Sequence, residues 1–331
     1  MTTGLAPWIQ AQLGQLLSLR GHAWLLQGPS GLGQYPLAMA LASAWLCEAP
    51  GKEGACGTCG SCHSIEVRTH ADLFVLMPET VMLQLGWPLS EKAQGEIDKK
   101  ERKPSKEVRV DAMRDAVEFS QRTSARGRGK VVLIFPADRM NTVTANALLK
   151  TLEEPPGDVR FVLATEAPHQ LLPTVRSRCL THTMQWPAAP DAMALLIANG
   201  MAEPDARALL RASGQRPDNA LQLHQRGVTS ALWSQLPRNL ASGNLAAFAD
   251  WAAADLVDAL QKLCHDLLVV AAGGSPRFYE KADLPRRTDF HTLAQWWRDL
   301  SQTARTVEHP FNAGLFLEAL VAQGQRALRL P

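Results

Sequence analysis

Short apolar runs alternate with helix-like segments over residues 1–185. The runs are apolar at successive rather than alternate positions, which is typical of strands that are buried on both faces. Such strands, separated by helices, predict an α/β fold with a parallel sheet and helices on both faces. The predicted strands are Ala23–Leu26, Asp72–Leu76, Val131–Phe135, Arg160–Ala164 and a fifth near Cys179–Met184.

Two helices are predicted in this part of the chain. One follows a glycine-rich segment and runs over about Tyr35–Leu46. The other, about Val143–Glu154, has apolar residues on one face and is stopped by Pro155-Pro156-Gly157. Glu153 and Glu154 lie at the negative end of the second helix. They are interpreted either as a solvated helix end or as a pair kept for a basic neighbour.

Between Pro78 and Val110 the pattern of apolar positions dissolves. The stretch Glu91–Arg109 holds seven Lys or Arg and five Asp or Glu without an apolar stripe. It is therefore expected to be an exposed and mobile insertion. Its run KKERKPSK is interpreted as a solvated loop, with contact to DNA as the alternative.

After Trp186-Pro187 the chain becomes rich in Ala, Leu and Trp and shows no strand-like alternation. We expect two all-helical pieces here, a small one followed by a larger one. The predicted helices are short ones near 190–226 and longer ones over about Leu245–Ala272, His291–Val307 and Asn312–Leu328.

Composition narrows the class of protein only a little. The chain has 331 residues, enough for two or three domains, and is 46% hydrophobic and 20% charged. Its formal net charge of +2 neither requires nor excludes a nucleic-acid partner. No run approaches the roughly 18 apolar residues of a membrane helix, and the N-terminus does not resemble a secretory signal. We therefore expect a cytoplasmic protein whose six cysteines serve a purpose other than disulfides.

Four of the cysteines have the spacing of a metal site. Cys47, Cys56, Cys59 and Cys62 follow the pattern C-x8-C-x2-C-x2-C. Four thiolates around one ion leave no open position, which predicts a structural rather than a catalytic zinc site. A redox pair or free thiols are the alternatives, and His63 and His70 are close enough in sequence to be substitute ligands. Cys179 and Cys264 stand alone and are expected to be buried small residues.

The segment LLQGPSGLGQYPL resembles a phosphate-binding loop that lacks its reactive side chains. Gly28, Gly31 and Gly33 keep the turn, but Gln34 and Tyr35 stand where Lys and Ser or Thr would neutralise phosphate and hold magnesium. The second element of such a site, an acid after a strand, is also displaced. Pro136 and Ala137 follow the predicted strand, and an acid, Asp138, comes only after them. We predict no ATP hydrolysis at this site.

Further segments carry a family resemblance. "ANALLKTLEEPP" (145–156), "FVLAT" (161–165), "LLPTVRSRC" (171–179) and "HPFNAGLFLEALV" (309–321) occur in a specific order and spacing. With the degenerate loop and the inserted cysteines, they resemble the delta-prime family of bacterial DNA polymerase III clamp-loader subunits, which are AAA+ proteins. The resemblance implies a RecA-like AAA+ domain over 1–185 with a zinc module at 47–62, a small helical lid over 186–227, and an all-α collar and oligomerisation domain over 228–331.

The resemblance also implies partners and roles. Such a subunit would assemble with gamma or tau ATPase subunits and a delta subunit in a hetero-pentamer, and would meet the sliding clamp and primer-template DNA through that complex, not a membrane. Arg178 matches an arginine finger that acts in trans on a neighbour's ATP site; the alternative is that it forms a structural ion pair. Thr165 matches the first sensor position of the degenerate nucleotide site. Pro217 replaces the second sensor arginine, beside Arg216.

The implied function is that of a non-hydrolysing subunit that helps to load the sliding clamp. The chain would be part of the DNA polymerase III holoenzyme without ATPase or polymerase activity of its own. Two alternatives remain open at the level of sequence. One is an AAA+ ATPase with an atypical loop, and the other is a zinc-containing nucleic-acid-binding module.

Overall fold

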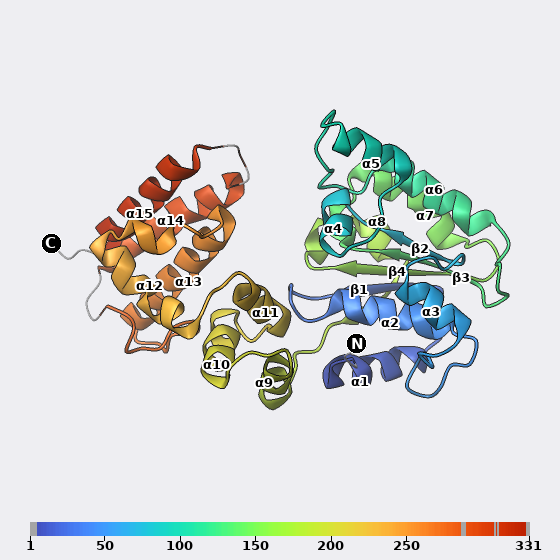
Figure 1. The fold of residues 1–331 in the computed structure, drawn as a ribbon, viewed down its shortest axis with the longest axis horizontal. Helices are drawn as coiled ribbons and strands as arrows, with labels where there is room; N and C mark the ends of the chain where they lie inside the picture. The colour runs from blue at the N-terminus through green and yellow to red at the C-terminus, as the bar shows by residue number, and fades with distance from the viewer. Residues whose placement is uncertain (1–4, 286–288, 308, 310, 329–331) are drawn as a thin grey trace. The chain divides into compact units, whose positions relative to one another are not determined.

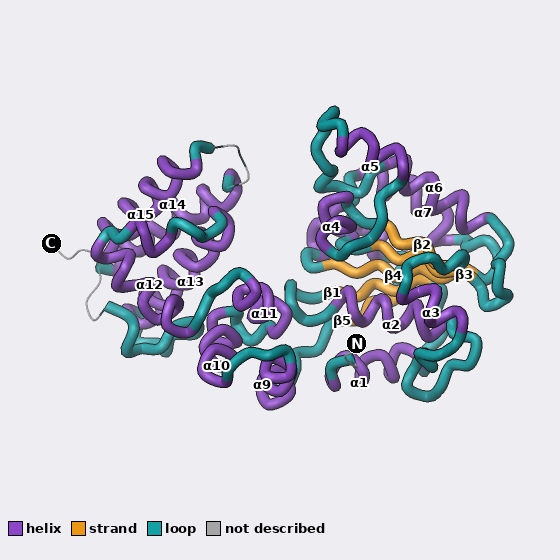
Figure 2. The backbone as a smooth tube through the Cα atoms, viewed as in Figure 1, coloured by secondary structure: helices purple, strands orange, loops and turns teal. Residues whose placement is uncertain are grey.

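The structure is a computed structural model that describes residues 5–285, 289–307, 309 and 311–328. The chain divides into two compact units, Met1–Asp191 and Ala192–Pro331. The first unit contains a sheet and helices, whereas the regular elements described in the second unit are all helices, joined by loops (Figures 1 and 2).

The first unit is built on a five-stranded parallel sheet, which confirms the predicted α/β architecture. The strand order is β2-β3-β4-β1-β5, and every neighbouring pair is parallel. Leu25 on β1 lies beside Leu163 on β4, and both side chains are fully buried. The strands are β1 (Ala23–Gln27), β2 (Leu73–Leu76), β3 (Lys130–Ile134), β4 (Val159–Thr165) and β5 (Leu180–Thr183).

Helices cover both faces of this sheet, as predicted. Figure 1 shows α1, α2 and α3 on one side and α6 and α7 on the other. Side chains of alternate strand positions, such as Leu25 and Phe161, pack into one core with Met113 of α6 and Leu148 of α7. The helices are α1 (Pro7–Leu17), α2 (Gln34–Leu46), α3 (Gly60–Glu66), α6 (Val110–Gln121), α7 (Thr142–Glu153) and α8 (Pro173–Arg176), with short 3₁₀ turns at Ala137–Arg139 and Pro168–Gln170.

The charged insertion, expected to be exposed and mobile, contains regular structure that its lack of an apolar pattern did not indicate. It forms α4 (Glu79–Gln84) and α5 (Glu91–Asp98), the latter capped by Ser90, whose hydroxyl accepts the N–H of Ala93. The pattern of apolar positions did not indicate these helices, because an ion pair rather than an apolar face holds them in place. Arg102 binds the carboxylate of Glu79 with both terminal nitrogens, at 2.5 and 2.8 Å. Glu79 is only 7% exposed, so this pair joins the first helix of the insertion to the segment that follows its second helix.

The second unit has a single continuous core. Buried residues from Ala192 to Leu328 form one cluster, so the small and large helical pieces share their interior. The division into a lid at 186–227 and a collar at 228–331 remains a prediction. The elements are α9 (Ala189–Ala198), which starts in the first unit, α10 (Glu203–Ala212), α11 (Pro217–Gln225), α12 (Ser230–Ser242), η3 (Leu245–Phe248), α13 (Ala253–Ala271), α14 (Phe290–Thr306) and α15 (Ala313–Leu328).

One helix boundary in this unit differs from the prediction, and one helix was not predicted. The helix expected to start at Leu245 begins at Ala253, because a 3₁₀ turn over Leu245–Phe248 precedes it. Helix α12 was not predicted, and it carries Pro237 in its interior, a residue that normally ends a helix. Among the described residues, no helix is long and apolar enough to cross a membrane. Pro310 of the sequence segment 309–321 lies outside the described residues.

Candidate functional site

The four predicted metal ligands converge. The Sγ atoms of Cys47, Cys56, Cys59 and Cys62 all lie within 4.8 Å of one another. Cys47 Sγ is 3.8 Å from the Sγ atoms of Cys59 and Cys62, and Cys56 Sγ is 3.9 Å from that of Cys62. Metal–sulfur bonds of about 2.3 Å in a tetrahedron give sulfur–sulfur edges of about 3.8 Å. The four cysteines could therefore bind one metal ion.

The backbone supports the sulfurs in this arrangement. Cys47 follows α2 directly, and Cys59 is the N-cap of α3, whose Sγ accepts the N–H of Cys62 at 3.5 Å. The N–H of Cys56 donates to Cys47 Sγ at 3.2 Å. Hydrogen bonds from the backbone N–H groups of Thr58 and Cys59 lower the pKa of Cys56 to about 6, which favours the thiolate that ligates metal.

Neither histidine replaces a cysteine in the cluster. His70 is buried, with Nε2 3.2 Å from the hydroxyl of Ser61 and Nδ1 accepting the N–H of Asp72. Both ring nitrogens are thus used within the protein. His63 is exposed on α3 and does not join the group of converging ligands found among the described residues. All six cysteines are free thiols, so no disulfide pairs the cluster, and Cys264 is buried while Cys179 is partly buried.

The glycine loop connects β1 to α2, where a phosphate-binding loop would lie. Gly31 and Gly33 have φ angles of 80° and 91°, which only glycine adopts without strain. A Cβ on Gly33 would lie 2.6 Å from Cδ1 of Ile9, because α1 packs against the loop. Trp8 of the same helix donates its Nε1–H to the carbonyl of Leu32 at 3.3 Å.

Gln34 closes this loop on itself. Its side chain is 2% exposed, and Nε2 donates to the carbonyl oxygens of Gly28 at 2.9 Å and Pro29 at 2.7 Å. The sequence indicated only that a positive charge was missing at this position. The structure shows in addition that the side-chain amide of Gln34 links the two ends of the turn by hydrogen bonds.

The other positions of the degenerate nucleotide site are also occupied by internal contacts. Tyr35 packs its ring on Phe135 at 5.3 Å between centroids, and its hydroxyl accepts the indole N–H of Trp87. Burial raises the pKa of Tyr35. Thr165 is fully buried at the end of β4, and its hydroxyl lies 2.5 Å from Oδ1 of Asp138. The displaced acid is thus bound to the predicted sensor residue.

Arg178 follows α8 and is held by Glu153. Its Nε and Nη2 donate to Oε2 of Glu153 at 3.2 and 3.0 Å, and Nη1 donates to the carbonyl of Thr174. The arginine side chain is 30% exposed and that of Glu153 is 60% exposed. Of the two interpretations of the acidic helix end, Glu153 therefore fits a residue kept for a basic neighbour.

The predicted second-sensor region also folds back on itself. Pro217 is the first residue of α11, and Arg216 is its N-cap. The Nε of Arg216 donates to the carbonyl of Ser213 at 2.7 Å. The proline fixes the start of the helix, and the adjacent arginine caps the preceding turn.

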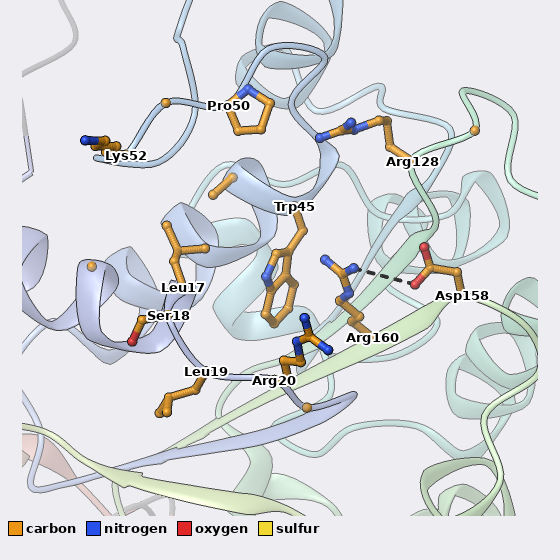
Figure 3. Close-up of a pocket in the computed structure, with 15 residues that line it drawn as sticks. Leu17, Ser18, Leu19, Arg20, Trp45, Pro50, Lys52, Arg128, Asp158 and Arg160 are labelled. Atoms are coloured by element: carbon orange, nitrogen blue, oxygen red, sulfur yellow. Dashed lines mark ion pairs between the residues drawn. The ribbon is translucent and has the colours of Figure 1, made fainter.

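The sequence interpretation missed a basic pocket in the first unit. Its volume is about 800 Å³, and the side chains around it include Arg20, Trp45, Lys52, Arg128 and Arg160 (Figure 3). These residues are scattered over more than a hundred positions of the sequence. Only the local run Arg126-Gly127-Arg128 could have signalled them.

Comparison with known proteins gives consistent relatives. The family model described as "DNA polymerase III, delta subunit" matches residues 18–187. A DNA polymerase III subunit delta' of Pseudomonas aeruginosa is 39% identical over 192 residues, which cover 57% of this chain and 52% of that protein. This chain thus spans about half the length of that relative. The subunit delta' of Escherichia coli is 32% identical over 277 residues, covering 77% of this chain and 76% of that protein.

A solved structure shares the fold. It is a DNA polymerase III gamma subunit-related protein from Thermotoga maritima, with a TM-score of 0.50 and 15% sequence identity. The superposition covers 97% of this chain and 99% of that chain. At this identity the likeness concerns the fold alone.

Proposed function

The chain belongs to the DNA polymerase III delta-subunit family, and on that premise we propose that it is a delta-prime subunit of a clamp loader. In this role it helps to load a sliding clamp onto primed DNA without hydrolysing ATP itself. Its partners would be gamma or tau ATPase subunits and a delta subunit in a hetero-pentamer. The first unit would be the AAA+ domain, with the lid at 186–227 and the collar at 228–331.

The contacts of the glycine loop support an inert nucleotide site. A phosphate-binding loop offers free backbone N–H groups and a lysine to the ligand. Here Gln34 spans the loop from α2 to the carbonyls of Gly28 and Pro29. The metal-binding hydroxyl is replaced by Tyr35, which is packed against Phe135. A loop held closed in this way should bind phosphate weakly, because phosphate binding would first have to break the internal hydrogen bonds of the loop.

The single observation that carries the proposed role is the presentation of Arg178. An ion pair with an exposed carboxylate is worth only about 0–1 kcal/mol, so Glu153 can orient the arginine and still release it. The guanidinium is thereby positioned at the surface, where a neighbour's nucleotide could take over its contacts. Its planar fork suits γ-phosphate oxygens, and an arginine finger can raise the rate of phosphoryl transfer by about 10³–10⁵.

The metal of the cysteine cluster is proposed to be zinc in a structural role. Four sulfur ligands at tetrahedral spacing leave no position for water or substrate, which is typical of structural zinc. The ion would join the end of α2 to the start of α3 and close the intervening loop. Catalysis by this ion is not part of the proposal.

The test is reconstitution of the complex from purified subunits of the same organism. Gamma or tau and delta are combined with or without this chain, and clamp-stimulated and DNA-stimulated ATPase activity is measured. We expect one copy of the chain in each complex, and activity that depends on it. A complex that reaches full ATPase and clamp-loading rates without the chain would contradict the proposed function.

A further inference from the structure

The basic pocket lies at the edge of the sheet opposite the glycine loop. Gly21 precedes β1 and Asp158 precedes β4, whereas the loop follows the carboxyl end of β1. The C-terminal turns of α1 and α2 complete the pocket with Leu17 and Trp45 (Figure 3). The pocket is therefore separate from the glycine loop and from Thr165 at the end of β4. Arg178 precedes β5 at the same edge of the sheet as the pocket but is not among its lining residues.

The charge around this pocket is strongly one-sided. Arg20, Lys52, Arg128 and Arg160 face a single lining carboxylate, that of Asp158, which lies 3.7 Å from Arg160. The other three cations have no ion-pair partner within the described part of the chain. The ends of α1 and α2 oppose an anion with about half a negative charge each. Four cations outweigh this and the carboxylate together.

The arrangement of the cations favours a chain of phosphates over a single anion. Figure 3 shows Lys52, Arg128 and Arg20 on different sides of the cavity rather than aimed at one point. Trp45 is half-buried between them, with the guanidinium of Arg160 5.2 Å from its ring centroid. Separated cations around an aromatic ring are typical of sites for single-stranded nucleic acid, in which arginine and lysine track the backbone and aromatic rings contact bases. We propose that this pocket binds the phosphodiester backbone of a single-stranded nucleic acid.

The cysteine cluster positions one wall of the pocket. Pro50, Gly51 and Lys52 belong to the loop between Cys47 and Cys56, two of the metal-binding residues. Gly51 and Gly54 close this loop through paired backbone hydrogen bonds of 2.8 and 3.3 Å. A metal ion that fixes both cysteines would also fix Lys52. The proposed zinc site therefore gains a consequence besides local stability, namely the shape of the basic pocket.

The test uses the full chain purified with its metal. Fluorescein-labelled oligothymidylate and oligouridylate of about twelve nucleotides are titrated by anisotropy at about 50 and about 200 mM salt. The pocket variant is Arg20→Glu with Arg128→Glu, both exposed positions. The control, Lys281→Glu with Arg298→Glu, changes the net charge equally at exposed positions in the second unit. Unaltered thermal unfolding of both variants confirms that they are folded.

We expect the pocket variant to bind at least about tenfold more weakly than the control at the lower salt concentration. If four cations contact phosphates, the logarithmic salt slope of the native chain is about −2.8, and the pocket variant loses about 1.4 of it. Weaker binding of either oligonucleotide by the pocket variant than by the control supports the proposal. The oligonucleotide that shows the effect identifies the ligand as DNA or RNA. Absence of binding, equal weakening in both variants, or displacement by polyglutamate as effective as by unlabelled oligonucleotide would overturn it.

Metal removal supplies a second, independent readout. Treatment with a chelator should weaken oligonucleotide binding by the native chain. The control variant should lose affinity to the same extent, because its pocket is unchanged. The pocket variant keeps Lys52, so the affinity that remains to it should also fall on chelation. Chelation that removes the metal and leaves the affinity of the native chain unchanged would refute the coupling between the cysteine cluster and Lys52.

Discussion

The side-chain amide of Gln34 lies 2.9 Å from the carbonyl oxygen of Gly28 and braces the loop that a nucleotide would otherwise occupy. The residue that replaces the phosphate-binding lysine thus has a structural role of its own. A lysine at this position could donate to the same carbonyl oxygens, but its charge would be buried without a phosphate to neutralise it, because the position is only 2% exposed.

The loop should stay inactive even when its two missing side chains are restored. We predict that the double variant Gln34→Lys with Tyr35→Thr shows no ATP hydrolysis above background. Pro136 and Ala137 supply no acid, and Asp138 is bound by the hydroxyl of Thr165 and the N–H of Glu166. Steady-state phosphate release by the isolated chain measures this. Turnover at a rate of about 1 s⁻¹ or more, within the ordinary range for enzymes, would show that the loop alone made the site inert.

The cysteine cluster should hold one zinc ion per chain. Cys59→Ser removes one thiolate, and serine is a good N-cap, so the start of α3 should survive the change. We expect zinc content to fall well below one ion per chain, with faster hydrogen exchange in residues 47–66 and unchanged exchange in β3 and β4.

Elemental analysis and hydrogen exchange of the same samples test this prediction. Cys179→Ser, which changes a cysteine outside the cluster, serves as the control and should retain its metal. Zinc-free native protein from a preparation made without chelator would exclude the site. Unaltered zinc content in Cys59→Ser would exclude this ligand set.

The charged insertion should depend on Glu79. Glu79→Gln keeps the shape but weakens the contacts with Arg102, and we expect the free energy of local opening across α4 and α5 to fall by about 1–3 kcal/mol. Glu96→Gln, at a more exposed contact of the same arginine, should have a smaller effect. Hydrogen exchange over residues 79–105 measures both. Equal effects would contradict the role of Glu79 as the anchor.

The same pair gives a pH dependence with a definite sign. Hydrogen bonds from Arg102 lower the pKa of Glu79 below its ordinary value of 4.5. The stabilisation is therefore complete above about pH 4.5 and is lost as the pH falls through the lowered pKa of the folded state. Protection of the insertion should decrease at acidic pH in the native chain and much less in Glu79→Gln.

Asp218 in the second unit should behave in the opposite way. Burial raises the pKa of this carboxyl from 3.8 to about 6. The folded state therefore binds the proton more tightly, and its ionisation costs stability as the pH rises from about 4 to about 6, by about 3 kcal/mol when complete. Asp218→Asn should raise the unfolding midpoint near pH 8 and change it little near pH 4.

Asp205 provides the matched comparison for that measurement. Hydrogen bonds from the hydroxyl and N–H of Ser230 lower the pKa of Asp205, so ionisation of this group favours folding. Asp205→Asn should destabilise the chain at neutral pH, with an effect that fades as the pH falls below the ordinary value of the carboxyl. Thermal unfolding at several pH values follows both variants. A change in stability of the same sign at neutral pH for Asp205→Asn and Asp218→Asn would contradict the opposite pKa shifts of the two carboxyls.

The sequence was informative where chemistry follows from local spacing. The strands of the sheet, the convergence of Cys47 with Cys56, Cys59 and Cys62, and the end of α7 at Pro155-Pro156 follow from short patterns. The contacts that could not be predicted join distant segments through polar groups. Arg102 to Glu79 spans 23 positions, and Arg178 to Glu153 spans 25. Apolar periodicity carries no information about such pairs, so it could not indicate the two helices of the insertion.

The trans role of Arg178 is the centre of the proposed function, and its removal should not disturb the fold. The side chain is partly exposed, so Arg178→Ala opens no core cavity and leaves only the exposed Glu153 without its partner. Arg178→Lys should also be impaired, because a point charge does not reproduce the guanidinium fork. Arg122→Ala, which breaks an exposed ion pair with Glu118 in the same unit, is the matched control.

Steady-state ATPase activity of reconstituted complexes that carry each of these variants, with incorporation of the chain verified, tests the account most directly. We predict a partial loss of total turnover for Arg178→Ala and Arg178→Lys, since one of several sites is affected, a larger loss of clamp loading, and native rates for Arg122→Ala. Native ATPase and clamp-loading rates in the complex with Arg178→Ala would contradict the account and leave the chain a role in assembly alone.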